Sequence, residues 1–81
     1  MKEVYVKFKP NTETDMNKLL EWLFVNNITT KSYNRTIGIY PVEDKIFRVS
    51  VDLATNTITF GCFYGQRLTL PLEVIDKVET I

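Results

Sequence analysis

The sequence predicts an α+β fold, in which one main helix packs on one face of a mostly antiparallel sheet of about four to six strands. Period-two alternation of apolar and polar residues near the N-terminus predicts a strand, and helical periodicity follows it between Thr12 and Asn27. The second half contains several short apolar segments separated by turn residues, which is typical of strands. The expected order is therefore β-α, then about four or five strands, then a short C-terminal helix or strand.

Composition indicates a small folded domain. The chain has 81 residues, of which 44% are hydrophobic and 25% are charged. We expect one domain over residues 1–81 with a small core, because a domain of this size buries only about 60–65% of its unfolded surface. Ten basic and ten acidic residues leave no net charge, so composition alone does not favour a nucleic-acid partner.

Secretory and membrane segments are not predicted. The longest apolar run, Trp22 to Val25, is far too short to span a bilayer. The N-terminal residues do not contain an apolar segment followed by a small-residue cleavage site, so a signal peptide is not expected. Cys62 is the only cysteine, so an intrachain disulfide cannot form, as is usual in a reducing cytoplasm. We therefore expect a cytoplasmic protein that does not bind membranes.

Particular residues set the predicted limits of the first strand and of the helix. Val4, Val6 and Phe8 lie on one face of the strand, and Pro10 ends it because proline cannot donate to a sheet. Thr12 is the expected N-cap of the helix. Asparagine tolerates the left-handed conformation, so the helix should end near residues 26–27, after about 14 residues or roughly 21 Å.

The helix carries more apolar residues than one face can hold. At about 100° per residue, one wide arc should face the sheet; its members are Met16, Leu19, Leu20, Leu23 and Phe24. Trp22 lies roughly 130° from the centre of this arc, with Val25 and Lys18 beyond it. Two outcomes are open for Trp22. The chain itself covers it, either at the core margin or with a C-terminal segment containing Leu72, Ile75 and Val78, or it lies exposed as an anchor for a partner.

Two further segments and a hairpin follow the helix. Residues 29–34 are β-prone but polar, which indicates an edge strand, and residues 36–42 predict another strand. The hairpin comprises residues 46–52 and 58–63. Its apolar residues share one face only if Val51 lies opposite Ile58 across a four-residue loop from Leu53 to Asn56. Ile46 and Phe63 then become neighbours on the opposite face.

The last part of the chain has two interpretations. Residues 67–70 predict a strand that Pro71 ends, and Pro71 permits a first helical turn. Leu72, Ile75 and Val78 have helical spacing, which is compatible with a short terminal helix. The alternative is a single turn followed by a short strand over residues 78–81.

Catalysis and cofactor binding are not expected. Histidine is absent, although it is the commonest general acid–base residue, and one cysteine cannot provide a Cys/His zinc site. The hairpin register places Cys62 inward as a small hydrophobic residue. Glu43 and Asp44 are adjacent carboxylates in a turn, where solvation is the ordinary outcome. We therefore expect a protein without enzymatic activity, metal or cofactor.

Two short stretches raise nucleic-acid binding as the alternative function. Val4-Tyr5-Val6 before an N-capped helix resembles the opening of an RNA-recognition motif, and this resemblance implies that Tyr5 stacks on a base. Phe60-Gly61-Cys62-Phe63 resembles the second aromatic motif of that family, but Cys62 stands where an aromatic residue would stack. These stretches do not suffice to assign the family.

Basic and aromatic residues interleave in the polar segment after the helix. Lys31, Tyr33 and Arg35 would share one side of an extended strand, where they can stack on bases and neutralise phosphates of a single-stranded nucleic acid. A solvated strand face, whose lysine discourages edge pairing, explains the same pattern.

Protein binding is the function that the sequence favours. Trp22 and Val25, with Lys18 beside them, would form a compact anchor on the outer helix surface, because tryptophan is enriched among interface hot spots. Ile46 and Phe63 form a second candidate patch. We expect a regulator, accessory subunit or inhibitor, of the kind that phages and mobile elements encode, which binds another protein or a second copy of itself.

Overall fold

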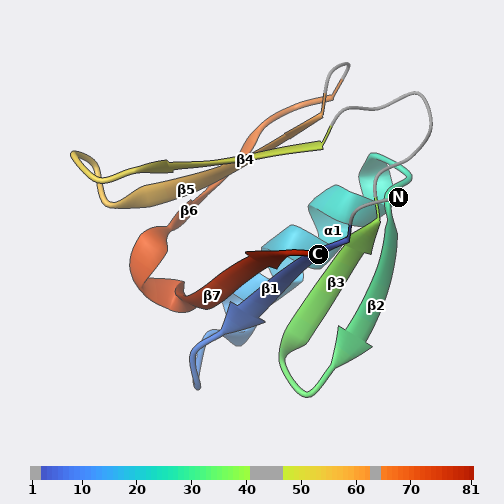
Figure 1. The fold of residues 1–81 in the computed structure, drawn as a ribbon, viewed down its shortest axis with the longest axis horizontal. Coiled ribbons are helices and arrows are strands. Elements are labelled where there is room, and N and C mark those ends of the chain that lie inside the picture. Colours follow the sequence, from blue (N-terminus) through green and yellow to red (C-terminus); the bar gives the residue numbers. More distant parts are fainter. Residues whose placement is uncertain (1–2, 41–46, 63–64) are drawn as a thin grey trace.

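The computed structural model of the chain describes residues 3–40, 47–62 and 65–81. In these ranges the elements are, in chain order, β1 (Val4–Phe8), α1 (Glu13–Val25), β2 (Thr29–Tyr33), β3 (Thr36–Tyr40), β4 (Phe47–Asp52), β5 (Thr57–Cys62), β6 (Leu68–Pro71), a 3₁₀ turn (Leu72–Val74) and β7 (Ile75–Thr80). The strands form a four-stranded sheet of order β2-β3-β1-β7 and a three-stranded sheet of order β4-β5-β6 (Figure 1).

The predicted α+β class is confirmed, but the single sheet is wrong. β1 is antiparallel to β3 on one side and to β7 on the other, so both of its edges are occupied. β5 pairs in the same way with β4 and β6, which gives the second half of the chain a sheet of its own. Alternation predicts that a segment is a strand, but it does not predict which strand will be its neighbour.

The four-stranded sheet has the connectivity of a split βαβ unit. Helix α1 connects β1 to β2, and β3 returns antiparallel between them. β2 is an edge strand, as predicted, and all five of its residues are exposed. The three-stranded sheet lies between β3 and β7 in the sequence and packs above the helix (Figure 1).

Helix α1 has nearly the predicted bounds. The conformation expected at its C-terminus is confirmed, but the side-chain cap expected at its N-terminus is not formed. Asn27 follows the C-terminus with φ 55°, the left-handed conformation expected of it. Thr12 occupies the N-cap position but makes no capping bond with its side chain. Its hydroxyl instead donates to the carbonyl oxygen of Lys9 at 2.6 Å. Thr12 therefore stabilises the preceding turn rather than the helix terminus.

The buried stripe of α1 differs from the predicted arc. Leu19, Trp22 and Leu23 are buried, at spacings of three and four residues. Phe24 was expected to face the sheet, but the residue is 83% exposed. The helix contacts both β2 and β6, so its buried stripe faces the angle between the two sheets instead of one sheet alone.

Trp22 is covered by the protein itself and is only 8% exposed. Its indole N–H donates to the carbonyl oxygen of Gln66 at 2.6 Å, and its ring centroid lies 6.5 Å from that of Phe60. Two of the contacts that cover Trp22 therefore come from β5 and from the segment before β6.

The hairpin of β4 and β5 has the predicted register. Val51 lies opposite Ile58, with a four-residue connection between the strands. The carboxylate of Asp52 accepts the amide N–H of Ala54 at 2.9 Å, and Asn56 has φ 54°. Ile46 and Phe63, the second predicted protein-binding patch, lie outside the described residues.

The C-terminal segment follows the turn-and-strand alternative. Residues 72–74 form a single 3₁₀ turn after Pro71, and β7 begins directly after it at Ile75, earlier than predicted. The short terminal helix is therefore wrong. Pairing with β1 determines the outcome, because Val78 lies opposite Val6 and completes the row of apolar residues under the helix.

We expect adjacent substitutions in α1 to differ sharply in their effect on stability. Leu23→Ala should lower the free energy of unfolding by about 2–5 kcal/mol, because Leu23 is fully buried. Phe24→Ala should change it by less than about 0.5 kcal/mol, apart from a small gain in helix propensity. Urea unfolding followed by circular dichroism measures both. A large loss in Phe24→Ala would contradict the placement of the helix.

Candidate functional site

The outer face of the four-stranded sheet, opposite the helix, is the most distinctive surface among the described residues. Strand pairing places Lys31, Gly38, Tyr5 and Glu79 in one row across the four strands. An adjacent row contains Tyr33, Thr36, Lys7 and Lys77, and Tyr40 lies on the other side opposite Thr29. We call the group Tyr5, Tyr33, Tyr40, Lys31 and Gly38 the tyrosine face.

Gly38 lets the ring of Tyr5 lie close to the sheet. A Cβ atom at Gly38 would be 3.0 Å from Cε1 of Tyr5, closer than ordinary van der Waals contact. Any larger residue in the middle of β3 would therefore push this ring outward. Gly38 therefore allows the half-buried Tyr5 ring to lie flat against the sheet.

The hydroxyl of Tyr5 donates a hydrogen bond to the carboxylate of Glu3. This bond, with desolvation and the charge of Glu3, raises the pKa of Tyr5 from 10.0 to about 12. The protonated phenol is favoured because ionisation would place two negative charges beside each other. Tyr5 is therefore held as a hydrogen-bonded neutral ring.

Lys31 and Tyr33 interact on the edge strand β2. The ammonium nitrogen of Lys31 lies 5.2 Å from the centroid of the Tyr33 ring, within the range of a cation–π contact. Hydrogen bonding with Tyr33 is the main reason that the pKa of Lys31 is raised above its usual value. Tyr33 is itself 43% exposed, so the pair offers a charged and an aromatic group to solvent.

The other charges on this face are largely paired with one another. Lys7 lies 3.7 Å from Asp76, and Lys77 lies 2.5 Å from Glu79. Glu79 is also directly opposite Tyr5 in the sheet. The surface is consequently aromatic and of mixed charge rather than uniformly basic.

Of the residues predicted to bind nucleic acid, the structure brings together three and separates the fourth. Tyr5, Lys31 and Tyr33 share the tyrosine face. Arg35 lies in the β2–β3 turn with φ 68° and does not continue the strand, so its predicted alignment with Lys31 is wrong. Its guanidinium donates to the carbonyl oxygen of Lys9 at 3.4 Å, which holds it at the end of β1.

Sequence reasoning missed Gly38 and Tyr40. The signal was present in β3, where alternation with the buried Ile37 and Ile39 sends Thr36, Gly38 and Tyr40 to the outer face. The second stretch that resembles an RNA-recognition motif lies elsewhere. Phe60 is fully buried in the three-stranded sheet, so it cannot stack on a base beside Tyr5.

The residues predicted to bind protein line a shallow hollow on another surface. Lys18, Trp22 and Val25, together with Gln66 and Leu68, border a space of about 290 Å³ between α1 and β6. Trp22 is buried beneath it, whereas Val25 is 70% exposed. The structure thus brings the three predicted residues together but removes Trp22 as a protruding anchor.

Residues considered for chemistry are either buried or outside the described ranges. Cys62 is a buried thiol, and Glu43 and Asp44 belong to the segment that the structure does not describe. Within residues 3–40, 47–62 and 65–81, no three cysteine or carboxylate side chains are grouped to hold a metal ion. No helix in those ranges has the length and apolar character needed to cross a membrane.

Comparison with protein-family models, curated proteins and solved structures gives no match to this chain. The functional assignment therefore depends on the geometry of the surfaces.

We expect the phenol of Tyr5 to titrate near pH 12 and that of the Glu3→Gln variant closer to 10, because the negative acceptor is lost. A raised pKa stabilises the folded state below pH 10, and this contribution disappears as the pH rises toward 12. NMR of tyrosines labelled with ¹³C at Cζ follows each ring, and Tyr5→Phe assigns the signal. Titration of Tyr5 near its ordinary pKa in the wild type would contradict the hydrogen bond.

Proposed function

We propose that this protein is a non-enzymatic binding module whose partner is another protein, and that the partner contacts the tyrosine face. A regulator, accessory subunit or inhibitor, including one encoded by a phage or mobile element, is consistent with a small chain that lacks histidine. A cytoplasmic location is part of this proposal and is supported by the single buried cysteine.

One observation carries the proposal: three tyrosines lie around Gly38 on a sheet face that no described element covers. Tyrosine is enriched among residues that dominate binding energy, since a rigid ring buries a large area and its hydroxyl still forms a hydrogen bond. Tyr5 is already held in place by Gly38 and Glu3, so little conformational freedom would be lost on binding.

The distribution of charge favours a protein over a nucleic acid. Glu3 is bonded to the hydroxyl of Tyr5 and Glu79 lies opposite the same residue, so two carboxylates flank the central ring. These carboxylates would repel the phosphates of a strand stacked there. A protein surface can instead supply basic and hydrogen-bonding groups to them.

Single-stranded nucleic acid is the second candidate. The observation that favours it is the contact between Lys31 and Tyr33 on the same face as Tyr5, because successive aromatic rings beside a cation can hold stacked bases.

We expect Tyr33→Ala to weaken partner binding by about tenfold or more without unfolding the protein, because the side chain is exposed on an edge strand. Val25→Ala removes an exposed apolar residue from the separate hollow and is the matched control. Affinity purification with each variant, followed by titration of the recovered partner, measures the difference. If Val25→Ala loses the partner and Tyr33→Ala keeps it, the binding surface is the hollow beside α1.

A second pair of variants tests the role of the glycine in β3. Gly38→Ala should displace the ring of Tyr5 and weaken binding, since the added Cβ meets Cε1 at 3.0 Å. Gly61→Ala is the control, because its Cβ would have only an ordinary 3.7 Å contact on the other sheet. Equal partner affinity in both variants would show that the position of Tyr5 does not matter.

Oligonucleotide titration separates the two candidate functions. If the protein binds nucleic acid, its affinity for single-stranded DNA or RNA should fall steeply as the salt concentration rises. The slope of this dependence reports the number of phosphate contacts, and Lys31→Gln should lower that number by about one. We expect no measurable binding even at low salt. Salt-dependent binding lost in Tyr33→Ala would overturn the preference for a protein partner.

A further inference from the structure

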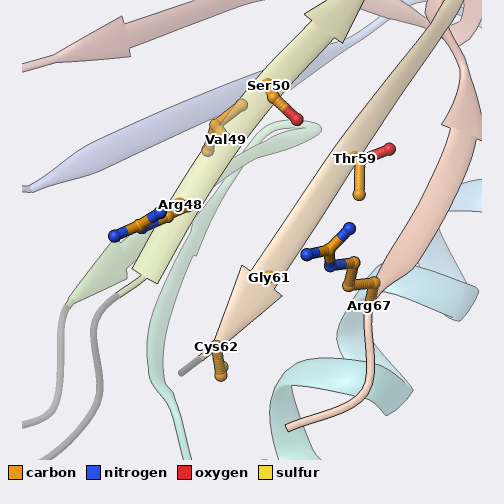
Figure 2. A pocket seen from close by; sticks show the side chains of 7 residues that line it. All are labelled: Arg48, Val49, Ser50, Thr59, Gly61, Cys62 and Arg67. Atoms are coloured by element: carbon orange, nitrogen blue, oxygen red, sulfur yellow. The ribbon is translucent and has the colours of Figure 1, made fainter. Parts of the chain in front are cut away.

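The outer face of the three-stranded sheet holds a furrow of about 630 Å³ that the proposed protein-binding surface does not use. Figure 2 shows it bordered by Arg48 and Ser50 of β4, Thr59 and Gly61 of β5, and Arg67 before β6. Arg48, Ser50, Thr59 and Gly61 alternate with the apolar residues that pack on the core, so they lie on the other face of the sheet. Val49 and Cys62 of the core side complete the lining. We call this group the arginine furrow.

Gly61 separates the two arginines. Arg48 lies directly opposite Gly61 in the sheet, and Cγ of Arg67 would lie 3.7 Å from a Cβ atom placed on that glycine. Gly61 therefore leaves an open position beside Arg67. Figure 2 shows the Arg67 side chain directed toward β5 and the Arg48 side chain directed away from it, so Arg48 must turn over β5 for both guanidinium groups to meet one ligand.

Neither guanidinium group has a carboxylate partner within residues 3–40, 47–62 and 65–81. Arg48 and Arg67 are both exposed. None of the described residues that line the furrow is acidic. Asp52, at the far end of β4, is engaged by the amides of the β4–β5 turn.

Hydroxyl groups form the adjoining row. Ser50 lies opposite Thr59, and the hydroxyl of Thr59 is 3.1 Å from that of Thr69. A ligand oxygen held between the arginines would meet hydrogen-bond donors one row along the strands.

From these observations we propose that the arginine furrow binds a phosphate monoester. Two guanidinium groups match the double negative charge of such a phosphate, and their fork geometry suits its oxygens. A carboxylate would neutralise one charge only. A nucleic-acid strand would need a longer row of cations than two arginines. The phosphate can belong to a phosphorylated side chain or to a free small molecule. This inference concerns the opposite sheet and does not depend on the tyrosine face.

The test is an NMR titration of the ¹⁵N-labelled full chain with inorganic phosphate. Saturable shifts should be confined to amides around Gly61, Thr59 and Ser50, and sodium chloride at equal ionic strength should not reproduce them. Arg48→Gln and Arg67→Gln should each weaken binding by about tenfold or more. Lys9→Gln removes one exposed positive charge directly after β1 of the other sheet and should bind as the wild type does.

Gly61→Val supplies a variant that keeps every charge. It fills the open position between the arginines, and valine suits a central strand, so the fold should be retained while phosphate binding is lost. Wild-type affinity in Gly61→Val or in both arginine variants would overturn the proposal, as would shifts that sodium chloride reproduces.

Two further probes distinguish the sources of the phosphate. A phosphoserine peptide is compared with its unphosphorylated form, and a nucleoside monophosphate with its nucleoside. Tighter binding of the peptide would identify a phosphoprotein, and tighter binding of the nucleotide a free small molecule. Failure of both phosphorylated probes and of inorganic phosphate to bind would overturn the inference and leave the proposed protein-binding function unaffected.

Discussion

The burial of Trp22 against the three-stranded sheet is the contact on which the rest of the structure depends. A chain of 81 residues has one helix in its described part, and that helix must help to cover two sheets. The indole ring lies beside Phe60, and its N–H is satisfied by the carbonyl oxygen of Gln66. This arrangement buries a large aromatic residue without leaving its polar atom unpaired. It also connects the N-terminal helix with the second half of the chain.

Sharing one helix between two sheets leaves two outward faces of different chemistry. The four-stranded sheet presents tyrosines with paired charges, whereas the three-stranded sheet presents two arginines beside hydroxyl groups. In each face a glycine on a central strand controls the surface. Gly38 lets Tyr5 lie flat, and Gly61 leaves space between Arg48 and Arg67. Each surface is placed on strands whose inner side chains belong to the core, so both are rigidly supported.

Local patterns in the sequence were reliable wherever a short segment sets its own geometry. The β4–β5 register followed from the requirement that Val51 and Ile58 share a face, and the left-handed Asn27 and Asn56 followed from their side chains. The sequence identified Tyr5 and Lys31 as candidate binding residues but did not predict that they lie on one face of the same sheet. Each residue was identified in its own strand, but Gly38, which lies between them, belongs to a third.

The sequence by itself determined the α+β class, the helix, the edge strand β2 and the hairpin register, because these depend on periodicity and turn residues that are local in the chain. Only the tertiary structure decided that there are two sheets, that Trp22 is buried and Phe24 is exposed, and that β7 pairs with β1. These features depend on which surfaces meet across long sequence separations. Helical angles place Trp22 and Phe24 on different sides of α1, but a second sheet is required before either side is known to be the inside.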